Sequence, residues 1–184
     1  MPTQKITKKD LLRACIQVFR KQGYYRTSIQ DLAQATGLTK GVFYHHFASK
    51  EEIMHTVLDE TSTYFAEKVF KAAYDTALSA EQRLENVVAA ALKAFSNELG
   101  GCIFANTVLE TAHVEDTFLN QIKAFFASWQ QAMQTIFAAR HDVATADKLA
   151  ARVIADVEGS LVLMQLYKDR HYLTDAFARA KELL

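Results

Sequence analysis

The sequence predicts an all-α protein, and three observations lead to that prediction. The 184 residues include only six Gly and one Pro, too few for a turn-rich β-sandwich or a collagen-like repeat. Apolar residues recur at three- and four-residue intervals, the spacing that places them on one face of a helix. Ser, Thr and Asp cap signals precede these apolar runs, as they do at helix N-termini. We predict no β-strand.

The first two helices are bounded by recognisable end signals. One is expected to begin at a cap pair, Thr7 and Asp10, and to end at Gly23. The next is expected to begin at Ser28 and to stop at Gly37, where glycine accepts the positive φ that a tight turn needs. A short helix, a tight turn and another short helix make a helix-turn-helix.

The later helices follow from the same signals. A very short third helix is expected from about residue 39 to residue 46, and a long fourth helix starts at a capping box, Ser49 and Glu52. Asn97–Gly101 is a weak linker candidate. Further helices are expected near residues 80–98, 103–112, 116–140, 146–168 and 173–184.

The charged residues are divided unevenly along the chain. Residues 1–50 hold nine Lys or Arg against two Asp, a net charge of +7, whereas residues 51–184 hold 12 basic and 19 acidic groups, a net charge of −7. A basic N-terminal segment on an acidic remainder indicates an anionic partner for one end, although random clustering explains the charge alone equally well. We therefore expect two domains, residues 1–50 and residues 51–184.

The cellular compartment is expected to be the cytoplasm. Two cysteines, Cys15 and Cys102, do not make a disulfide framework, and this favours a reducing environment. No apolar run approaches the 18 residues of a membrane span, and Met1–Asp10 lacks the apolar core of a signal peptide. We expect no membrane contact and no cofactor.

The stretch from residue 27 to residue 50 carries the functional prediction. Its apolar side chains are expected to face the core, and its polar side chains are left on the outer face of the short third helix. Lysine, tyrosine and histidine side chains there can donate hydrogen bonds to phosphate, and a glycine allows the backbone to approach a groove. The inward set is Ile29, Leu32, Ala33, Leu38, Phe43 and Phe47; the outward set is Thr39, Lys40, Gly41, Tyr44 and His45.

This stretch resembles the signature of the TetR family of bacterial transcriptional regulators. The likeness extends over about 50 residues and lies at the N-terminal position that is usual in that family. The matching residues are Thr27, Leu32-Ala33, Gly37-Leu38-Thr39, Gly41, Phe43-Tyr44, His46-Phe47, Lys50-Glu51 and Ile53, preceded by Phe19, Gly23 and Tyr24.

The resemblance implies a homodimeric DNA-binding regulator, commonly a repressor. The third helix of each subunit would enter the major groove of a palindromic operator, and the helical remainder would dimerise and bind a small effector. Carried over by position, Lys40, Gly41 and Val42 are candidates for base contact, with Thr39 beside them. Candidates for phosphate contact are Tyr44, His45, His46 and Lys50, with Thr27 and Ser28 at the N-terminus of the second helix. For Val42 and His46 the alternative is that the side chain packs within the protein and does not contact DNA.

The C-terminal part resembles the branch of that family that contains NemR-like repressors. The likeness rests on Gly101-Cys102-Ile103, the Trp129 region and Glu158-Gly159-Ser160-Leu161. It makes Cys102 a possible sensor of electrophiles or oxidants, with a pKa lowered by the helix start. The alternatives are that Cys102 is a small buried hydrophobe and that Gln165, which stands where many branch members carry Lys, weakens thiol chemistry.

The effector is expected to be apolar or aromatic, because no strong cationic cluster marks residues 51–184. Most aromatic and Met residues at helical spacing belong to a core rather than to a pocket, and the polar members of the set would orient a ligand. The last two helices are apolar enough to pack against a second subunit, with a monomer core as the alternative. Candidate pocket residues are Phe65, Phe95, Phe104, Asn106, His113, Phe125, Trp129, Met133, Val162 and Gln165.

An enzyme is the remote alternative. Two Glu-x-x-His pairs, Glu52 with His55 and Glu110 with His113, are the half-motif of di-iron helical bundles. Glu52 serves a helix cap well, and a metal site would need the four side chains to converge in one core. Because we find no nucleophile–base set or phosphate-binding glycine loop either, we expect no catalytic and no metal-binding residues.

Overall fold

The computed structural model describes residues 7–95 and 100–184, which form nine α-helices, one 3-10 helix and no strand. The all-α prediction is therefore confirmed for these residues. The elements are α1 (Lys8–Gln22), α2 (Ile29–Thr36), α3 (Lys40–His46), α4 (Lys50–Lys68), η1 (Phe70–Tyr74), α5 (Ala80–Phe95), α6 (Ile103–Thr111), α7 (Leu119–Phe137), α8 (Val143–Tyr167) and α9 (His171–Glu182).

The side-chain caps at Thr7, Ser28 and Ser49 lie where the sequence predicts them. The Thr7 hydroxyl accepts a hydrogen bond from the Asp10 amide at 3.2 Å, and the Ser49 hydroxyl accepts one from the Glu52 amide at 3.1 Å. The expected start at residue 146 is three residues late, because the Asp142 carboxylate accepts from the Thr145 amide at 3.0 Å and begins α8 earlier.

The span of α7 and the presence of η1 also differ from expectation. α7 begins at residue 119 and ends at residue 137, inside the expected span 116–140. The 3-10 helix η1 is an element that the sequence does not predict. Residues 96–98 of the expected helix 80–98, and most of the expected linker 97–101, lie outside the described residues.

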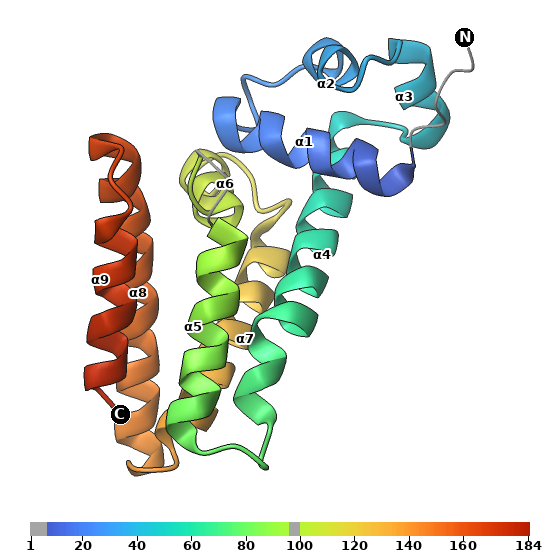
Figure 1. Ribbon diagram of the computed structural model, residues 1–184. Coiled ribbons are helices and arrows are strands. Elements are labelled where there is room, and N and C mark those ends of the chain that lie inside the picture. Colours follow the sequence, from blue (N-terminus) through green and yellow to red (C-terminus); the bar gives the residue numbers. More distant parts are fainter. Residues whose placement is uncertain (1–6, 96–99) are drawn as a thin grey trace, which may run out of the picture.

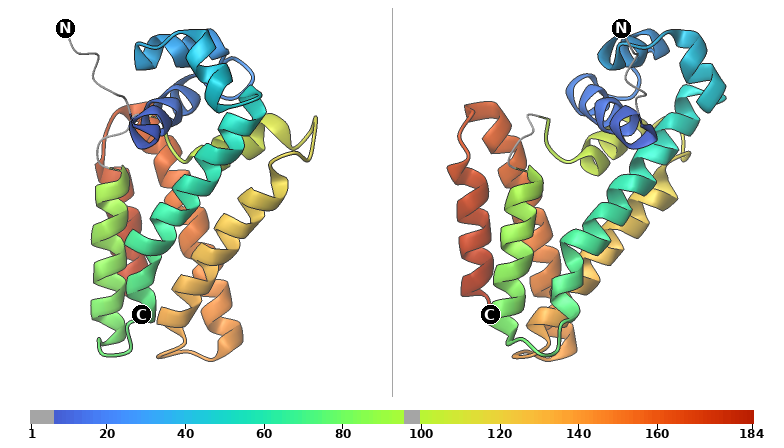
Figure 2. Two further views of the ribbon diagram at one scale, coloured as in Figure 1. Left: turned by 90° about the vertical axis from the view of Figure 1, so that its right-hand side faces the viewer. Right: turned by 45° about the vertical axis from the view of Figure 1, so that its right-hand side comes forward.

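The molecule has a head, α1–α3, at one end of a body, α4–α9 (Figure 1). α4 leaves the head and runs down into the body, so it connects the two covalently. α6 lies under α1, whereas α8 and α9 run side by side along one flank (Figure 2). Among the described residues, no helix combines the length and the apolar character that a bilayer span requires.

The head has its own apolar core, which is continuous with that of the body. Phe19 from α1, Leu32 from α2 and Phe43 from α3 are each at most 2% exposed, and Ile53 at the start of α4 is fully buried. Burial of three side chains of this size stabilises the head by several kcal/mol, at about 1.5–3 kcal/mol for each. The head therefore presents the outer face of α3 on a packed support.

Candidate nucleic-acid interface

The turn between α2 and α3 is held by local hydrogen bonds. Ser28 and Asp31 form a full capping box at the start of α2: the Ser28 hydroxyl accepts from the Asp31 amide at 3.2 Å, and the Asp31 carboxylate accepts from the Ser28 amide at 2.7 Å. These bonds with Ser28 lower the pKa of Asp31. At the other end Gly37 takes a left-handed conformation (φ +67°), and the Leu38 amide donates to the Ala33 carbonyl at 3.0 Å. The sequence-predicted helix-turn-helix is thus formed.

α3 has one buried face and one exposed face. Phe43 is fully buried and Phe47 is 4% exposed, so both anchor the helix in the head. On the opposite face Tyr44 is 58% exposed, and a Cβ placed on Gly41 would meet only the Thr39 hydroxyl, at 3.8 Å. The exposed residues of this outer face are Thr39, Lys40, Gly41, Tyr44, His45 and His46, which we call the α3 face; Val42 is half-buried at its edge.

Two residues that are predicted to contact phosphate, Thr27 and Lys50, do not belong to the α3 face. The Thr27 side chain is 2% exposed and its hydroxyl donates to the Gly23 carbonyl at 2.6 Å, so this hydroxyl is committed within the head. The Lys50 ammonium donates to the Tyr24 carbonyl at 2.8 Å and lies 4.3 Å from the centre of the Tyr24 ring. Burial lowers the pKa of Lys50, and the nearby carboxylates Glu110 and Glu115 oppose that shift.

Most of the candidate effector residues form one buried aromatic cluster in the body. The Phe104 and Phe125 rings stack with centroids 3.8 Å apart and planes 6° apart. Phe65 meets the Phe125 ring edge-on at 5.4 Å, and Phe95 lies 5.7 Å from Phe65. The cluster comprises Phe65, Phe70, Phe95, Phe104, Phe125, Phe126 and Trp129, with Met133 buried on the same helix as Trp129.

The polar candidates do not all join this cluster. The Asn106 amide donates to the Gly100 carbonyl at 2.6 Å, and a Cβ on Gly101 would lie 2.3 Å from the Gln165 amide nitrogen. Asn106 and Gln165 therefore meet at the Gly100–Gly101 turn before α6. His113 is exposed after the end of α6, and Val162 is 61% exposed on α8, so neither lies among the buried rings.

Cys102 is 4% exposed at the N-terminus of α6, and its pKa is raised rather than lowered. Burial and the Glu158 carboxylate raise the pKa of the thiol, and they outweigh the Phe104 and Ala105 backbone amides, which lower it. The expectation of a lowered pKa is therefore wrong. Cys15 is fully buried on α1, where burial raises its pKa to about 12.

Sequence reasoning missed the groups around Cys102. Arg20, 8% exposed, and Glu158 on α8 both face this thiol, and burial raises the pKa of Glu158 to about 7, against the hydrogen bond from Cys102 and the charge of Arg20. The Oε1 atom of Glu158 has no hydrogen-bond partner among the described residues. The sequence offered one signal for them: Arg20 and Glu158 are charged residues that stand within the apolar stripes of their helices.

The Glu-x-x-His pairs do not converge. The Glu52 carboxylate accepts from the Ala48 amide at 2.6 Å, and the His55 imidazole pairs with Gln121 at 2.5 Å. The Glu110 carboxylate accepts from the Tyr25 amide, while His113 is exposed. In the part of the chain that the structure describes, no three His, Cys, Asp or Glu side chains are grouped in a way that could hold a metal ion.

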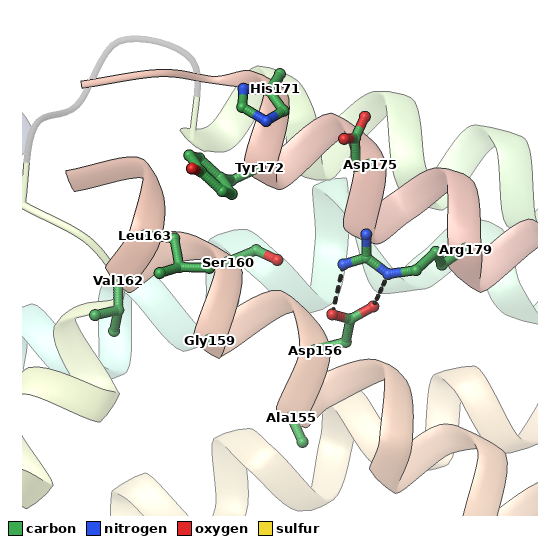
Figure 3. Close-up of a pocket in the computed structure, with 10 residues that line it drawn as sticks. All are labelled: Ala155, Asp156, Gly159, Ser160, Val162, Leu163, His171, Tyr172, Asp175 and Arg179. Carbon is green, nitrogen blue, oxygen red and sulfur yellow. Dashed lines mark hydrogen bonds and ion pairs between the residues drawn. The ribbon is translucent and has the colours of Figure 1, made fainter. Parts of the chain in front are cut away.

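The outer flank of α8 and α9 holds a groove of about 620 Å³ (Figure 3). Arg179 of α9 and Asp156 of α8 both line this groove, and they are joined by two hydrogen bonds, of 2.8 and 2.6 Å (Figure 3). Large apolar side chains on this part of α8 face solvent: Val162 is 61% exposed, Leu166 66% and Tyr167 60%. A flank of this kind is typical of a surface that a partner covers.

Comparison with known proteins assigns both parts of the chain. Residues 11–57 match the bacterial regulatory proteins of the tetR family, and residues 77–179 match the C-terminal domain of LmrA/YxaF-like transcriptional regulators. The HTH-type transcriptional repressor DhaR of Mycobacterium sp. (strain GP1) is 27% identical over 173 residues, covering 90% of this chain and 86% of that protein.

Solved structures have the same fold. A TetR transcriptional regulator from Legionella pneumophila superposes with a TM-score of 0.85 at 22% identity, with both chains fully covered. The reduced form of E. coli NemR has a TM-score of 0.76 at 16% identity, covering 94% of this chain and 93% of that one. Identities this low show the fold alone, so membership of the NemR-like branch stays a prediction.

Proposed function

The chain belongs to the TetR family of bacterial transcriptional regulators, and we propose that it is a cytoplasmic repressor that binds a palindromic operator as a homodimer and releases it when a small effector binds. The observation that carries the proposal is the α3 face, in which polar side chains and a glycine lie exposed opposite two buried phenylalanines. In this proposal residues 1–50 bind DNA and residues 51–184 bind the effector and the second subunit.

Each group on the α3 face suits one kind of DNA contact. The Lys40 ammonium can reach base acceptors in the major groove, and the bare Gly41 backbone allows the helix to approach the base edges. Tyr44, His45 and His46 can donate to phosphates on either side of the groove. Ser28 adds the N-terminus of α2, where the backbone amides outside the capping box favour an anion.

The second subunit is proposed to cover the outer flank of α8 and α9. The exposed Val162, Leu166 and Tyr167 and the adjacent groove would then be buried between two copies of the chain. Because a twofold dimer places its two α3 helices in successive major grooves, the half-sites should lie about 34–36 Å apart, or a multiple of that distance.

The effector is proposed to be a small apolar or aromatic molecule that enters near the aromatic cluster. The rings of Phe104, Phe125 and Trp129 would contact its faces, and Asn106 and Gln165, at the start of α6 and on α8, offer amide groups for orientation. Binding would favour a body conformation in which the two heads no longer match the operator spacing.

Fluorescence anisotropy of the purified protein with duplex DNA from upstream of its own coding region tests the proposal. Random duplex of equal length serves as competitor, at two salt concentrations. We expect preference for the upstream fragment by a factor on the order of 10³ or more. Equal affinities that fall together with salt would show only that the head is basic, and would contradict the proposal for this fragment.

Two lysine variants with the same change in charge separate base contact from charge. Lys40→Ala should weaken binding and lower the preference for the upstream fragment, because it removes a base contact. Lys71→Ala, in the exposed part of η1, removes the same charge away from the head and should leave the preference unchanged. Equal losses on both DNAs for Lys40→Ala would refute its role in base contact.

A further inference from the structure

The head touches the body at a second place besides α4. The loop after α1, residues 23–27, rests on the end of α6 and on the turn that leads to α7. This loop leads directly into Ser28, the cap of α2, so its position determines where the helix-turn-helix stands. α6 lies under α1 in the same region (Figure 2).

Tyr25 makes two hydrogen bonds across this junction, each to a different carboxylate. Its backbone amide donates to Glu110 Oε2 at 3.2 Å, and its phenol donates to Glu115 Oε1 at 3.0 Å. The Glu110 carboxylate also packs against Gly23, where an added Cβ would lie 2.1 Å from Glu110 Oε1. Glu110 belongs to α6 and Glu115 to the α6–α7 turn, so one residue of the head is tied to two places in the body.

Tyr24 supports the same junction from the other side. Its ring meets the fully buried Phe118 ring edge-on, with centroids 4.9 Å apart. Lys50 caps this arrangement, because its ammonium lies over the Tyr24 ring and donates to the Tyr24 carbonyl. Since that ammonium is already bonded within the protein, Lys50 is placed to orient the loop.

We propose that Tyr25, Glu110 and Glu115 form a clasp that holds the head in its DNA-binding orientation, with Lys50 as a positioning residue beneath it. This inference rests on the proposed function. It adds the contacts through which a conformational change in the body would reach the head. A displacement of α6 or of the α6–α7 turn pulls directly on Tyr25, three residues before the cap of α2.

Two alanine variants of neighbouring carboxylates test the clasp. Glu115→Ala removes a negative charge, the acceptor for the Tyr25 phenol and the acceptor for the Thr117 hydroxyl, whereas Tyr25→Phe leaves the Thr117 bond intact. Asp116→Ala removes only the charge, because this exposed side chain makes no hydrogen bond with the described residues. Loss of a negative charge by itself strengthens DNA binding, so Asp116→Ala should bind the upstream duplex as tightly as the wild type or slightly more tightly.

Glu115→Ala should instead weaken binding roughly two- to twelve-fold, the range that one net hydrogen bond covers. Tyr25→Phe should weaken it similarly, and the double variant should show no further loss, because both changes remove the same bond. Melting temperatures should remain close to that of Asp116→Ala. Affinity of Glu115→Ala equal to that of Asp116→Ala, or fully additive losses, would overturn the proposal.

Amide hydrogen exchange without DNA separates failure of the clasp from failure of the proposed function. Segment 23–28 should exchange faster in Glu115→Ala than in the wild type, and at the wild-type rate in Asp116→Ala. Equal exchange in Glu115→Ala and the wild type would overturn the clasp. If the wild type shows no preference for the upstream duplex, the proposed function fails while this measurement still decides on the clasp.

Discussion

Replacing Glu158 by Gln is expected to stabilise the protein more at pH 8 than at pH 5, in each case relative to the wild type. This carboxylate lies on α8 against the Cys102 thiol, and burial raises its pKa from an ordinary 4.5 to about 7. An acid whose pKa is raised by folding weakens the native state once it ionises. The contribution of Glu158 is therefore most favourable below pH 4.5 and is lost as the pH rises to about 7. The neutral amide of the Glu158→Gln variant imitates the protonated acid at every pH.

The magnitude follows from linkage. Each unit of pKa difference is worth about 1.4 kcal/mol, and titration of Glu158 between pH 5 and pH 8 therefore contributes about 2–3 kcal/mol to the difference in stability. The free energy of unfolding of Glu158→Gln minus that of the wild type should increase by about this amount over that range. Every other titratable group is present in both proteins and cancels in the difference.

Urea unfolding at half-unit pH steps, with equal protein concentration for both proteins, measures this difference. The matched control is Glu85→Gln, because Glu85 is an exposed side chain of α5 where the same substitution leaves the buried groups around Cys102 intact. A difference between Glu158→Gln and the wild type that does not vary with pH would refute the reasoning. A difference that decreases with pH would show that ionised Glu158 stabilises the fold.

Three smaller predictions concern the head and the thiols. Ser28→Ala removes the capping box of α2 and should lower the free energy of unfolding by about 0.5–2 kcal/mol in urea titration. Ser28→Thr should retain most of that stability, because its hydroxyl can still accept from the Asp31 amide and donate to the Asp31 carboxylate. Gly37→Ala meets no neighbour within 4 Å, so its cost of about 1–2 kcal/mol should come from the left-handed φ alone, and Gly37→Asn should cost less; equal losses would contradict that cause. Cys15 and Cys102 should react with a thiol reagent only as fast as the protein opens, since both are buried with raised pKa values; rapid labelling of native Cys102 would favour the sensor alternative.

The helices and the α3 face could be predicted because their signals are local. Ser28, Gly37 and Ser49 act on backbone groups within a few residues, so their effects can be read from spacing alone. The buried side of α3 was predicted in the same way, since Phe43 and Phe47 lie one turn apart. The start of α8 was missed although its cap, Asp142, is equally local.

The groups that depend on packing between distant segments could not be predicted. Lys50 matches a DNA-contact position, yet its partner is the Tyr24 carbonyl, which only the folded head brings within 2.8 Å. The N-terminus of α6 suggested a reactive Cys102, but the charged side chains that interact with its thiol, Arg20 and Glu158, come from α1 and α8. Spacing within one helix carries no information on how deeply a neighbouring helix covers it.

The parallel stack of Phe104 and Phe125 has a consequence for timing. A molecule that enters between these rings has to separate two faces that lie 3.8 Å apart before it can make its own contacts. Entry then waits for the rings to part, and the observed association rate reaches a ceiling as the ligand concentration rises. At such a ceiling, the time between the appearance of the effector and the change in transcription depends on the rate at which the two rings separate. It no longer depends on the concentration of the effector.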